Sequence, residues 1–188
     1  MAFIYSTTTE AGIDINNVFQ LSIVNNPEYP APPFLAGELA WGTDGSEWVY
    51  ATSSITIAPG STVLFSSTPG NWSVALITST LARTNFGALV GVTGGATGSV
   101  AVPSCGTNVT GNFFWVQRAG MAQKVLSGPS LGTTFATLHT TSNAGQLGAT
   151  GGTGTSAVVS GIVFSQVPTA TAAGYNAVLN YPTVGGQD

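Results

Sequence analysis

Apolar and polar residues alternate along most of the chain after residue 48. In "SITIAPGSTVLF", Ile55 and Ile57 alternate with polar residues before a Pro-Gly turn, and Val63 and Phe65 alternate after it. Similar short segments follow, punctuated by Gly or Pro: "NWSVALITSTLA", "FGALVGVTG", "GSVAVPS", "GNFFWVQRAGMAQKVLS", "TTFATLHTTS" and "SAVVSGIVFSQV". Evenly spaced short strands with such turns predict an all-β fold, either a sandwich or a small barrel.

The segment "GNFFWVQRAGMAQKVLS" carries apolar residues on both of its predicted faces. Because successive side chains of a strand point to opposite faces, Phe113, Trp115 and Gln117 would share one face. Phe114 and Val116 would lie on the other.

The N-terminal section has a different pattern, centred on "NPEYPAPPFL" at residues 26–35. Four prolines between residues 27 and 33 exclude a helix and a central strand, because proline lacks the N–H that either requires. We therefore expect an extended segment resembling polyproline II. The large rings interleaved with the prolines favour an arm laid on another surface over a plain flexible linker.

These patterns divide the chain into three parts. Residues 1–45 are predicted to be an extended arm rich in proline and aromatic residues, ending in a turn at Gly42–Gly45. Residues 46–168 are predicted to be the β domain, with a Gly-rich hairpin loop at 143–156. Residues 169–188 are predicted to be a short docking tail, in which "AGYNAVLNY" fits one helical turn or a last strand.

Charge is scarce and unevenly placed. Only 5% of residues are charged, and no Asp or Glu occurs in the 140 residues from 48 to 187. Three basic residues and a net charge of −4 argue against binding to nucleic acid or to anionic lipid. Such a surface is either neutral and rich in hydroxyls or covered by partners in an assembly.

The N-terminal residues lack the pattern of a signal peptide, and no apolar window is long enough for a membrane span. We therefore expect synthesis in the cytoplasm and no membrane association. With Cys105 as the single cysteine, no disulfide forms within the chain.

Candidate catalytic residues are few. Gly128–Gly132 spells G-x-S-x-G around Ser130, and His139 is the single histidine. A nucleophile elbow needs a strand-turn-helix unit and an acid partner, and neither is predicted nearby. Hydrolysis by Ser130 and His139 is therefore only a rival hypothesis, and we expect a protein that is not an enzyme.

Candidate ligand-binding motifs are equally weak. "GATGGTGTS" lacks the lysine of a phosphate-binding loop. Asp44 and Glu47 with turn carbonyls could hold Ca²⁺, but they supply few of the oxygens that a strong site uses. We expect no cofactor and no metal.

Several stretches together resemble the decoration, or cement, proteins that coat the heads of tailed bacteriophages. They are "GELAWGTDGSEWVYA" leading into "SSITIAPGSTVLF", then "TSNAGQLGAT" with "VVSGIVF", and the closing "AVLNYPTV". In addition, the G-x-x-x-G-V strand of Gly87–Val92 precedes G-x-x-x-W-V-Q-x-x-G at Gly111–Gly120, as it does in those proteins.

The resemblance implies a small β-sandwich or tulip-like β-barrel that clamps neighbouring capsid subunits on the exterior of a virion. Its partners would be the major capsid protein and copies of itself, as a trimer. An extended arm suits this role because proline reduces the entropy lost on docking. Deletion of residues 1–35 is expected to abolish capsid binding while leaving the β core folded. The residues expected at protein interfaces are Tyr29, Pro30, Pro32, Pro33, Phe34, Leu35, Trp41, Trp48, Tyr175, Leu179 and Tyr181.

Two other roles stay open. A tail or fibre component is one, and a carbohydrate-binding β module with exposed Trp72 and Trp115 rings is the other. For Trp48, burial in the core of the β domain is an alternative to an interface.

Overall fold

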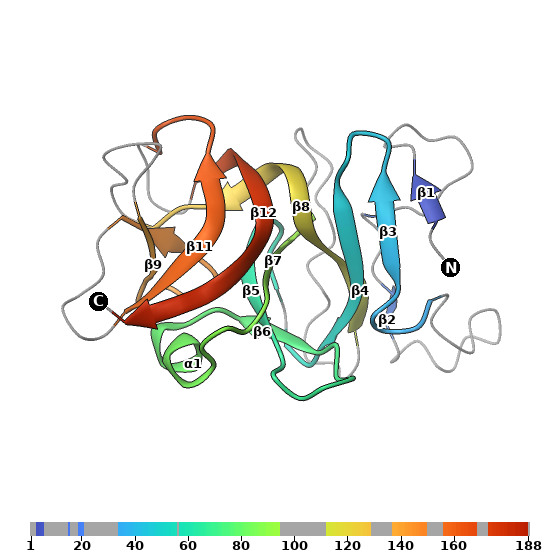
Figure 1. The fold of residues 1–188 in the computed structure, drawn as a ribbon, viewed down its shortest axis with the longest axis horizontal. Coiled ribbons are helices and arrows are strands. Elements are labelled where there is room, and N and C mark those ends of the chain that lie inside the picture. Colours follow the sequence, from blue (N-terminus) through green and yellow to red (C-terminus); the bar gives the residue numbers. More distant parts are fainter. Residues whose placement is uncertain are drawn as a thin grey trace.

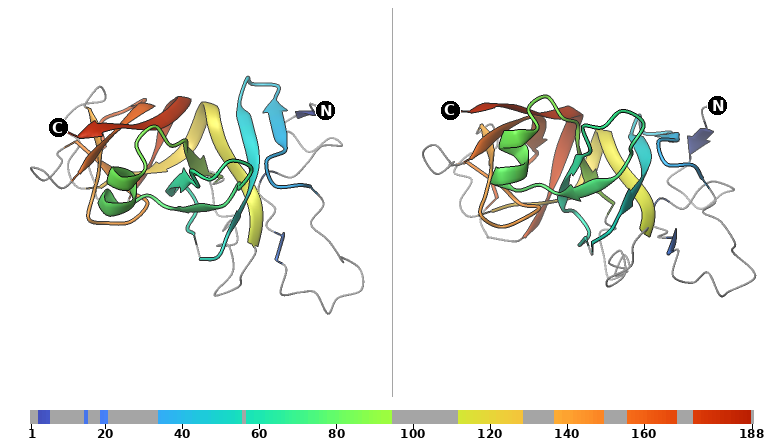
Figure 2. Two further views of the ribbon diagram at one scale, coloured as in Figure 1. Left: turned by 60° about the horizontal axis from the view of Figure 1, so that its bottom comes forward. Right: turned by 90° about the horizontal axis from the view of Figure 1, so that it is seen from below.

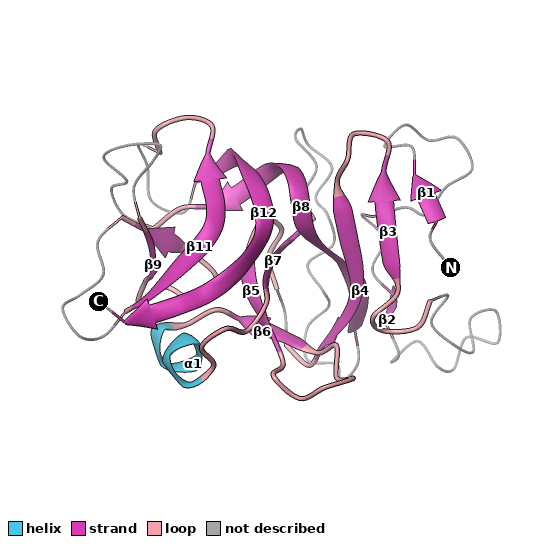
Figure 3. Ribbon diagram, viewed as in Figure 1, coloured by secondary structure: helices cyan, strands magenta, loops and turns pink. Residues whose placement is uncertain are grey.

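One large β-sheet organises the protein (Figure 1). The computed structural model describes residues 3–5, 15, 19–20, 34–55, 57–94, 112–128, 137–149, 156–168 and 173–187. Strands predominate over helix in these ranges (Figure 3), which confirms the all-β prediction. The elements are β1 (Phe3–Tyr5), β2 (Phe19–Gln20), β3 (Leu39–Gly42), β4 (Glu47–Ser53), β5 (Thr62–Phe65), β6 (Val74–Leu76), α1 (Ser79–Thr84), β7 (Val90–Thr93), β8 (Asn112–Leu126), β9 (Leu138–Thr140), β10 (Leu147–Gly148), β11 (Ala157–Phe164) and β12 (Gly174–Gln187).

The strand order is β1-β3-β4-β8-β12-β11-β9-β10, and β5, β6 and β7 join beside β8. The long strand β8 pairs with β4 along its first half and with β12 along its second half, both antiparallel. Beyond β12 the sheet curls into a half-barrel, and a bridge between Ser127 and Leu147 links β10 to the chain just after β8. On the other side, β3 and β4 extend the sheet away from the curled part (Figure 1).

The core has three clusters of buried side chains. The largest fills the curled part and includes Leu64, Val125, Phe164 and Leu179. A second cluster holds Phe114 and Val116 of β8, whereas Trp115 of β8 belongs to a third, aromatic cluster. The two faces predicted for β8 are therefore confirmed, and each face packs in a different core.

The sequence patterns around residues 53–82 predicted strands in places where the structure differs. Ile55 is exposed rather than part of a strand, because its N–H bonds to the hydroxyl of Ser53 (3.2 Å) just after β4 ends. Residues 79–84 form the helix α1, not a strand. The Thr78 hydroxyl accepts a bond from the Leu81 N–H (3.1 Å), which caps the helix. Helix α1 packs against β11 and β12 at the curled end (Figure 2).

The boundaries predicted at residues 45 and 169 also differ from the observed elements. Residue 45 lies in the turn between β3 and β4, which pair with each other, so the hairpin belongs to one folded unit. The predicted C-terminal tail contains β12, which lies between β8 and β11 rather than docking on the outside. Of the two alternatives for "AGYNAVLNY", the strand is the one observed. No helix among the described residues is long and apolar enough to cross a membrane.

Candidate interaction surface

The end of the proline-rich segment is attached to the sheet by an aromatic cluster. The Phe34 ring lies 5.4 Å from the ring of Tyr50 and 5.3 Å from that of Trp115, measured between centroids. Tyr50 in turn lies 5.0 Å from Trp115. Such contacts stabilise the fold beyond simple burial. Phe34, predicted at an interface with a partner, thus packs within its own chain.

Of the other residues predicted at interfaces, some are buried, some are exposed or half-buried, and some lie outside the described residues. Trp48 is 7% exposed and lies in the aromatic cluster, so its core alternative is the one observed. Tyr175 and Leu179 are buried in the curled part, because β12 is an interior strand. Leu35 and Tyr181 are exposed, at 74% and 49%, and Trp41 is half-buried. Tyr29, Pro30, Pro32 and Pro33 lie outside the described residues.

A charged cluster joins the β3–β4 hairpin to the two central strands. Arg118 Nη1 of β8 lies 3.7 Å from Glu47 Oε1 at the start of β4, and both side chains are largely buried. The Tyr181 hydroxyl of β12 donates to Glu47 Oε2 (2.9 Å), and the Arg118 guanidinium lies over the Tyr181 ring. Tyr181 adopts a left-handed backbone conformation with φ of 44°, which is strained for such a residue.

The same cluster favours the protonated form of the Tyr181 phenol. The hydrogen bond to Glu47 and the negative charge of that carboxylate raise the pKa of Tyr181 above its ordinary value. Burial, with a smaller contribution from Glu38, raises the pKa of Tyr50. Both phenols therefore stay protonated well above neutral pH.

The geometry does not assemble the calcium site considered from the sequence. Glu47 is paired with Arg118, and the Asp44 carboxylate accepts a bond from the Ser46 N–H (3.0 Å) within the turn. No group of three or more His, Cys, Asp or Glu residues that could hold a metal occurs in the part of the chain that is described.

An uninterrupted apolar row crosses the outer face of β11, β12 and β8, which lie side by side (Figure 1). Val178 of β12 is the register partner of Val163 on one side and of Met121 on the other. The three side chains are 44%, 42% and 49% exposed, respectively, while their strand neighbours Ile162, Leu179 and Ala122 point into the core. We call Met121, Val163 and Val178 the apolar row.

The sequence contains a signal for this row that alternation alone does not reveal. In "GIVF" and "AVLN" apolar residues are consecutive, so one of them must face outward in a strand. Only the observed register shows that the outward residues are neighbours.

The Trp72 and Trp115 rings, which were proposed for carbohydrate binding, are not exposed as predicted. Trp115 is 2% exposed and lies inside the aromatic cluster. Trp72 is half-buried against Phe65, with ring centroids 6.0 Å apart. Its indole also lies so close to Gly37 that a Cβ at that position would clash with Nε1 of the ring. The expectation of two exposed rings is therefore wrong.

Of the proposed hydrolase pair, Ser130 and His139, only His139 lies among the described residues. His139 is buried in β9, where it pairs with Val158 of β11. Ser130, like Cys105, lies outside the described residues. The hydrolase hypothesis therefore stays untested.

Comparison with known proteins adds no family assignment. Neither a scan against protein-family models nor a search of curated proteins gives a match to this chain.

Proposed function

We propose that the protein is a non-enzymatic structural component of a phage head, which decorates the capsid and stabilises it by contacting neighbouring subunits. The observation that carries this proposal is the apolar row on the outer face of the three central strands. Its position on paired strands makes it rigid, which reduces the entropy lost when a partner binds.

The energetics favour assembly with many copies rather than a strong single contact. Complete burial of one Val or Met side chain stabilises a protein by about 1.5–3 kcal/mol, so half-exposed residues would each add about 1 kcal/mol on docking. Three such residues give a weak contact. On a capsid lattice, many weak contacts act together, and the avidity exceeds that of each one.

Charge and sequence resemblance support the same role. With 5% charged residues, little electrostatic repulsion opposes close packing of copies or of capsid subunits. The resemblance to head decoration proteins supplies the partner class, namely the major capsid protein with further copies of this chain. The location that follows is the exterior of the virion.

Substitution in the apolar row tests the proposal. Val178→Lys places a charge in the centre of the row, and we expect at least a tenfold loss of capsid affinity, or about 1.4 kcal/mol. The assay is co-sedimentation of the purified protein with capsids that lack it. Val167→Lys is the matched control, because Val167 is equally exposed (43% against 44%) but lies outside the row. Equal binding of both variants would contradict the assigned surface, and no binding of the unmodified protein would contradict the proposed function.

A further inference from the structure

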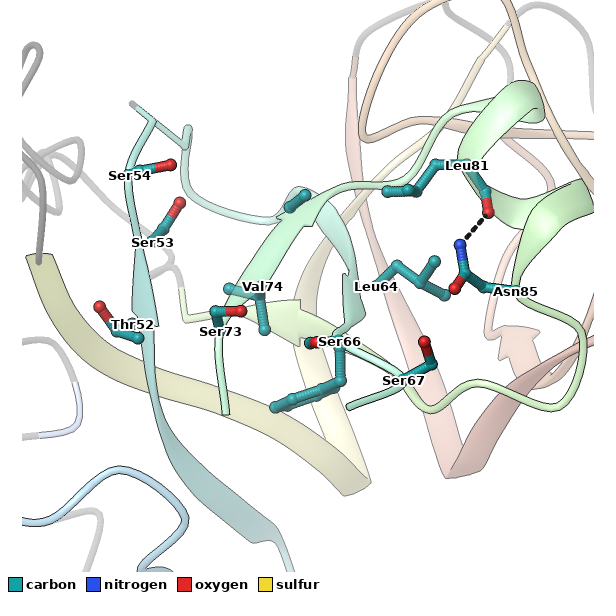
Figure 4. Close-up of a pocket in the computed structure, with 12 residues that line it drawn as sticks. Thr52, Ser53, Ser54, Leu64, Ser66, Ser67, Ser73, Val74, Leu81 and Asn85 are labelled. Atoms are coloured by element: carbon teal, nitrogen blue, oxygen red, sulfur yellow. Dashed lines mark hydrogen bonds between the residues drawn. The ribbon is translucent and has the colours of Figure 1, made fainter. Parts of the chain in front are cut away.

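A hydroxyl-lined trough lies between the end of β4 and helix α1 (Figure 4). It has a volume of about 620 Å³ and lies over the hairpin of β5 and β6. This volume is within the usual range of small-molecule sites, about 300–1,000 Å³. None of its lining residues belongs to the apolar row.

Side chains of the β5–β6 hairpin alternate between its two faces, and this alternation determines which of them form the floor of the trough. Val63, Phe65 and Val74 point into the core beneath β4. The opposite face carries Leu64, which is itself only 3% exposed, and its register partner Ala75, which is half-buried. Next to them, Ser73 accepts a backbone bond from Ser66 (2.9 Å). The floor thus combines an apolar patch with two small hydroxyl side chains.

The walls carry polar groups with unused hydrogen-bonding capacity. Within the described residues, no hydrogen bond is formed by the hydroxyls of Thr52 and Ser54 on one wall or of Ser67 near the other. The Asn85 amide nitrogen donates to the Leu81 carbonyl (2.8 Å), which leaves its amide oxygen free to accept. No lining residue is charged.

We propose that this trough binds a neutral saccharide. A sugar ring has an apolar C–H face, which fits the half-buried side chains of Ala75 and Leu81, and hydroxyls at its edge, which fit the polar groups of the walls. The absence of charge in the lining selects against sialic acids and phosphorylated ligands. An extended peptide fits less well, because peptides bind mainly by pairing with a strand edge, and the floor presents the face of a hairpin.

The affinity should be modest. Each sugar hydroxyl exchanges bonds to water for bonds to the protein, so the net gain of each bond is small. We expect a dissociation constant on the order of 1–10 mM for a disaccharide.

The test is a titration of the full-length, ¹⁵N-labelled protein with maltose, lactose and N,N′-diacetylchitobiose, followed by amide chemical shifts. We expect at least one sugar to cause saturable shifts around Ser54, Ser73 and Asn85. Ala75→Phe should abolish these shifts by filling the trough. Thr52→Val, which keeps the side-chain shape and removes one hydroxyl, should weaken binding by roughly threefold to tenfold.

Three results would overturn the proposal. One is the absence of saturable shifts with all three sugars up to about 50 mM, well above the expected dissociation constant. Another is an unchanged response in a folded Ala75→Phe variant. The third is a response to a neutral Ser-Ala peptide without a response to any sugar. None of these results would bear on capsid binding through the apolar row.

Discussion

At the scale of single residues, two of the few charges of the protein serve the fold. Glu47 and Arg118 form a largely buried pair, and Tyr181 completes it with a hydrogen bond. A buried pair adds little net stability compared with apolar residues, but removal of one partner leaves a buried charge without compensation. The carboxylate that ends the acidic part of the sequence therefore holds the β3–β4 hairpin against β8 and β12.

Loss of Arg118 should therefore destabilise the protein more than the loss of an exposed arginine. We expect Arg118→Met to lower the free energy of unfolding by about 3 kcal/mol, because Glu47 would remain buried without its cationic partner. The double variant with Glu47→Gln should recover part of that loss. Urea denaturation measures both, and Arg83→Met, which removes an exposed arginine at the end of α1, is the control. A change within about 0.5 kcal/mol for Arg118→Met, the range of ordinary surface substitutions, would contradict a structural role of the pair.

The buried phenol of Tyr50 should make stability fall at alkaline pH. Its pKa is raised in the folded state, so its contribution is fully present below the unfolded pKa of about 10 and is lost as pH rises toward the folded value. We expect the free energy of unfolding to fall by about 1.4 kcal/mol per pH unit above pH 10 from this group. Tyr50→Phe should flatten the profile of urea midpoints between pH 9 and pH 11, about one unit on either side of the ordinary pKa. Identical profiles for both proteins would refute this assignment.

At the scale of elements, the junction in β8 depends on close backbone approach. β8 changes partner from β4 to β12 at Ala119 and Gly120. Gly120 has φ of 88°, and a Cβ there would lie 2.7 Å from Ser46 Cα. Gly45, in the adjacent turn, has a similar φ of 80° but open space around it.

These two glycines form a matched pair for experiment. Gly45→Ala should cost about 1 kcal/mol, because it adds only the strain of the left-handed conformation. Gly120→Ala should cost about 1–3 kcal/mol more, because the hairpin must also move away from β8. Thermal and urea unfolding of both variants measure the difference, and equal losses would show that the close contact contributes nothing.

Sequence patterns were sufficient for some of these elements and not for others. Short apolar segments punctuated by Gly or Pro predicted β8 and β11, because the side chains of such segments pack into the cores. The pattern did not predict α1, since "ITSTLA" carries β-branched residues and the helix depends on a single cap at Thr78. The sequence pattern also left β12 ambiguous, because a proline such as Pro182 is unusual in an interior strand. The strand tolerates this proline where its register with β11 shifts, opposite Gly161.

At the scale of the whole molecule, the N-terminal section contributes to the fold, because β1 pairs with β3 and β2 pairs with β8. Phe34 packs on Tyr50 and Trp115, so removal of residues 1–35 would also disturb the core. A truncation that ends at residue 33 keeps Phe34 but still removes β1 and β2, so its stability must be measured beside its binding to capsids. The charge-poor section of the sequence then corresponds to the sheet, whose outer face carries the apolar row.

The central claim is the proposed decoration of a phage head, and locating the chain in particles tests it most directly. The measurement is an electron-microscopy map of intact particles of a phage whose genome encodes this chain. We predict ordered density for this fold on the outer surface of the head, repeated over the capsid lattice, with Met121, Val163 and Val178 against a neighbouring subunit. Density confined to the tail, or purified particles that lack the chain altogether, would contradict the account.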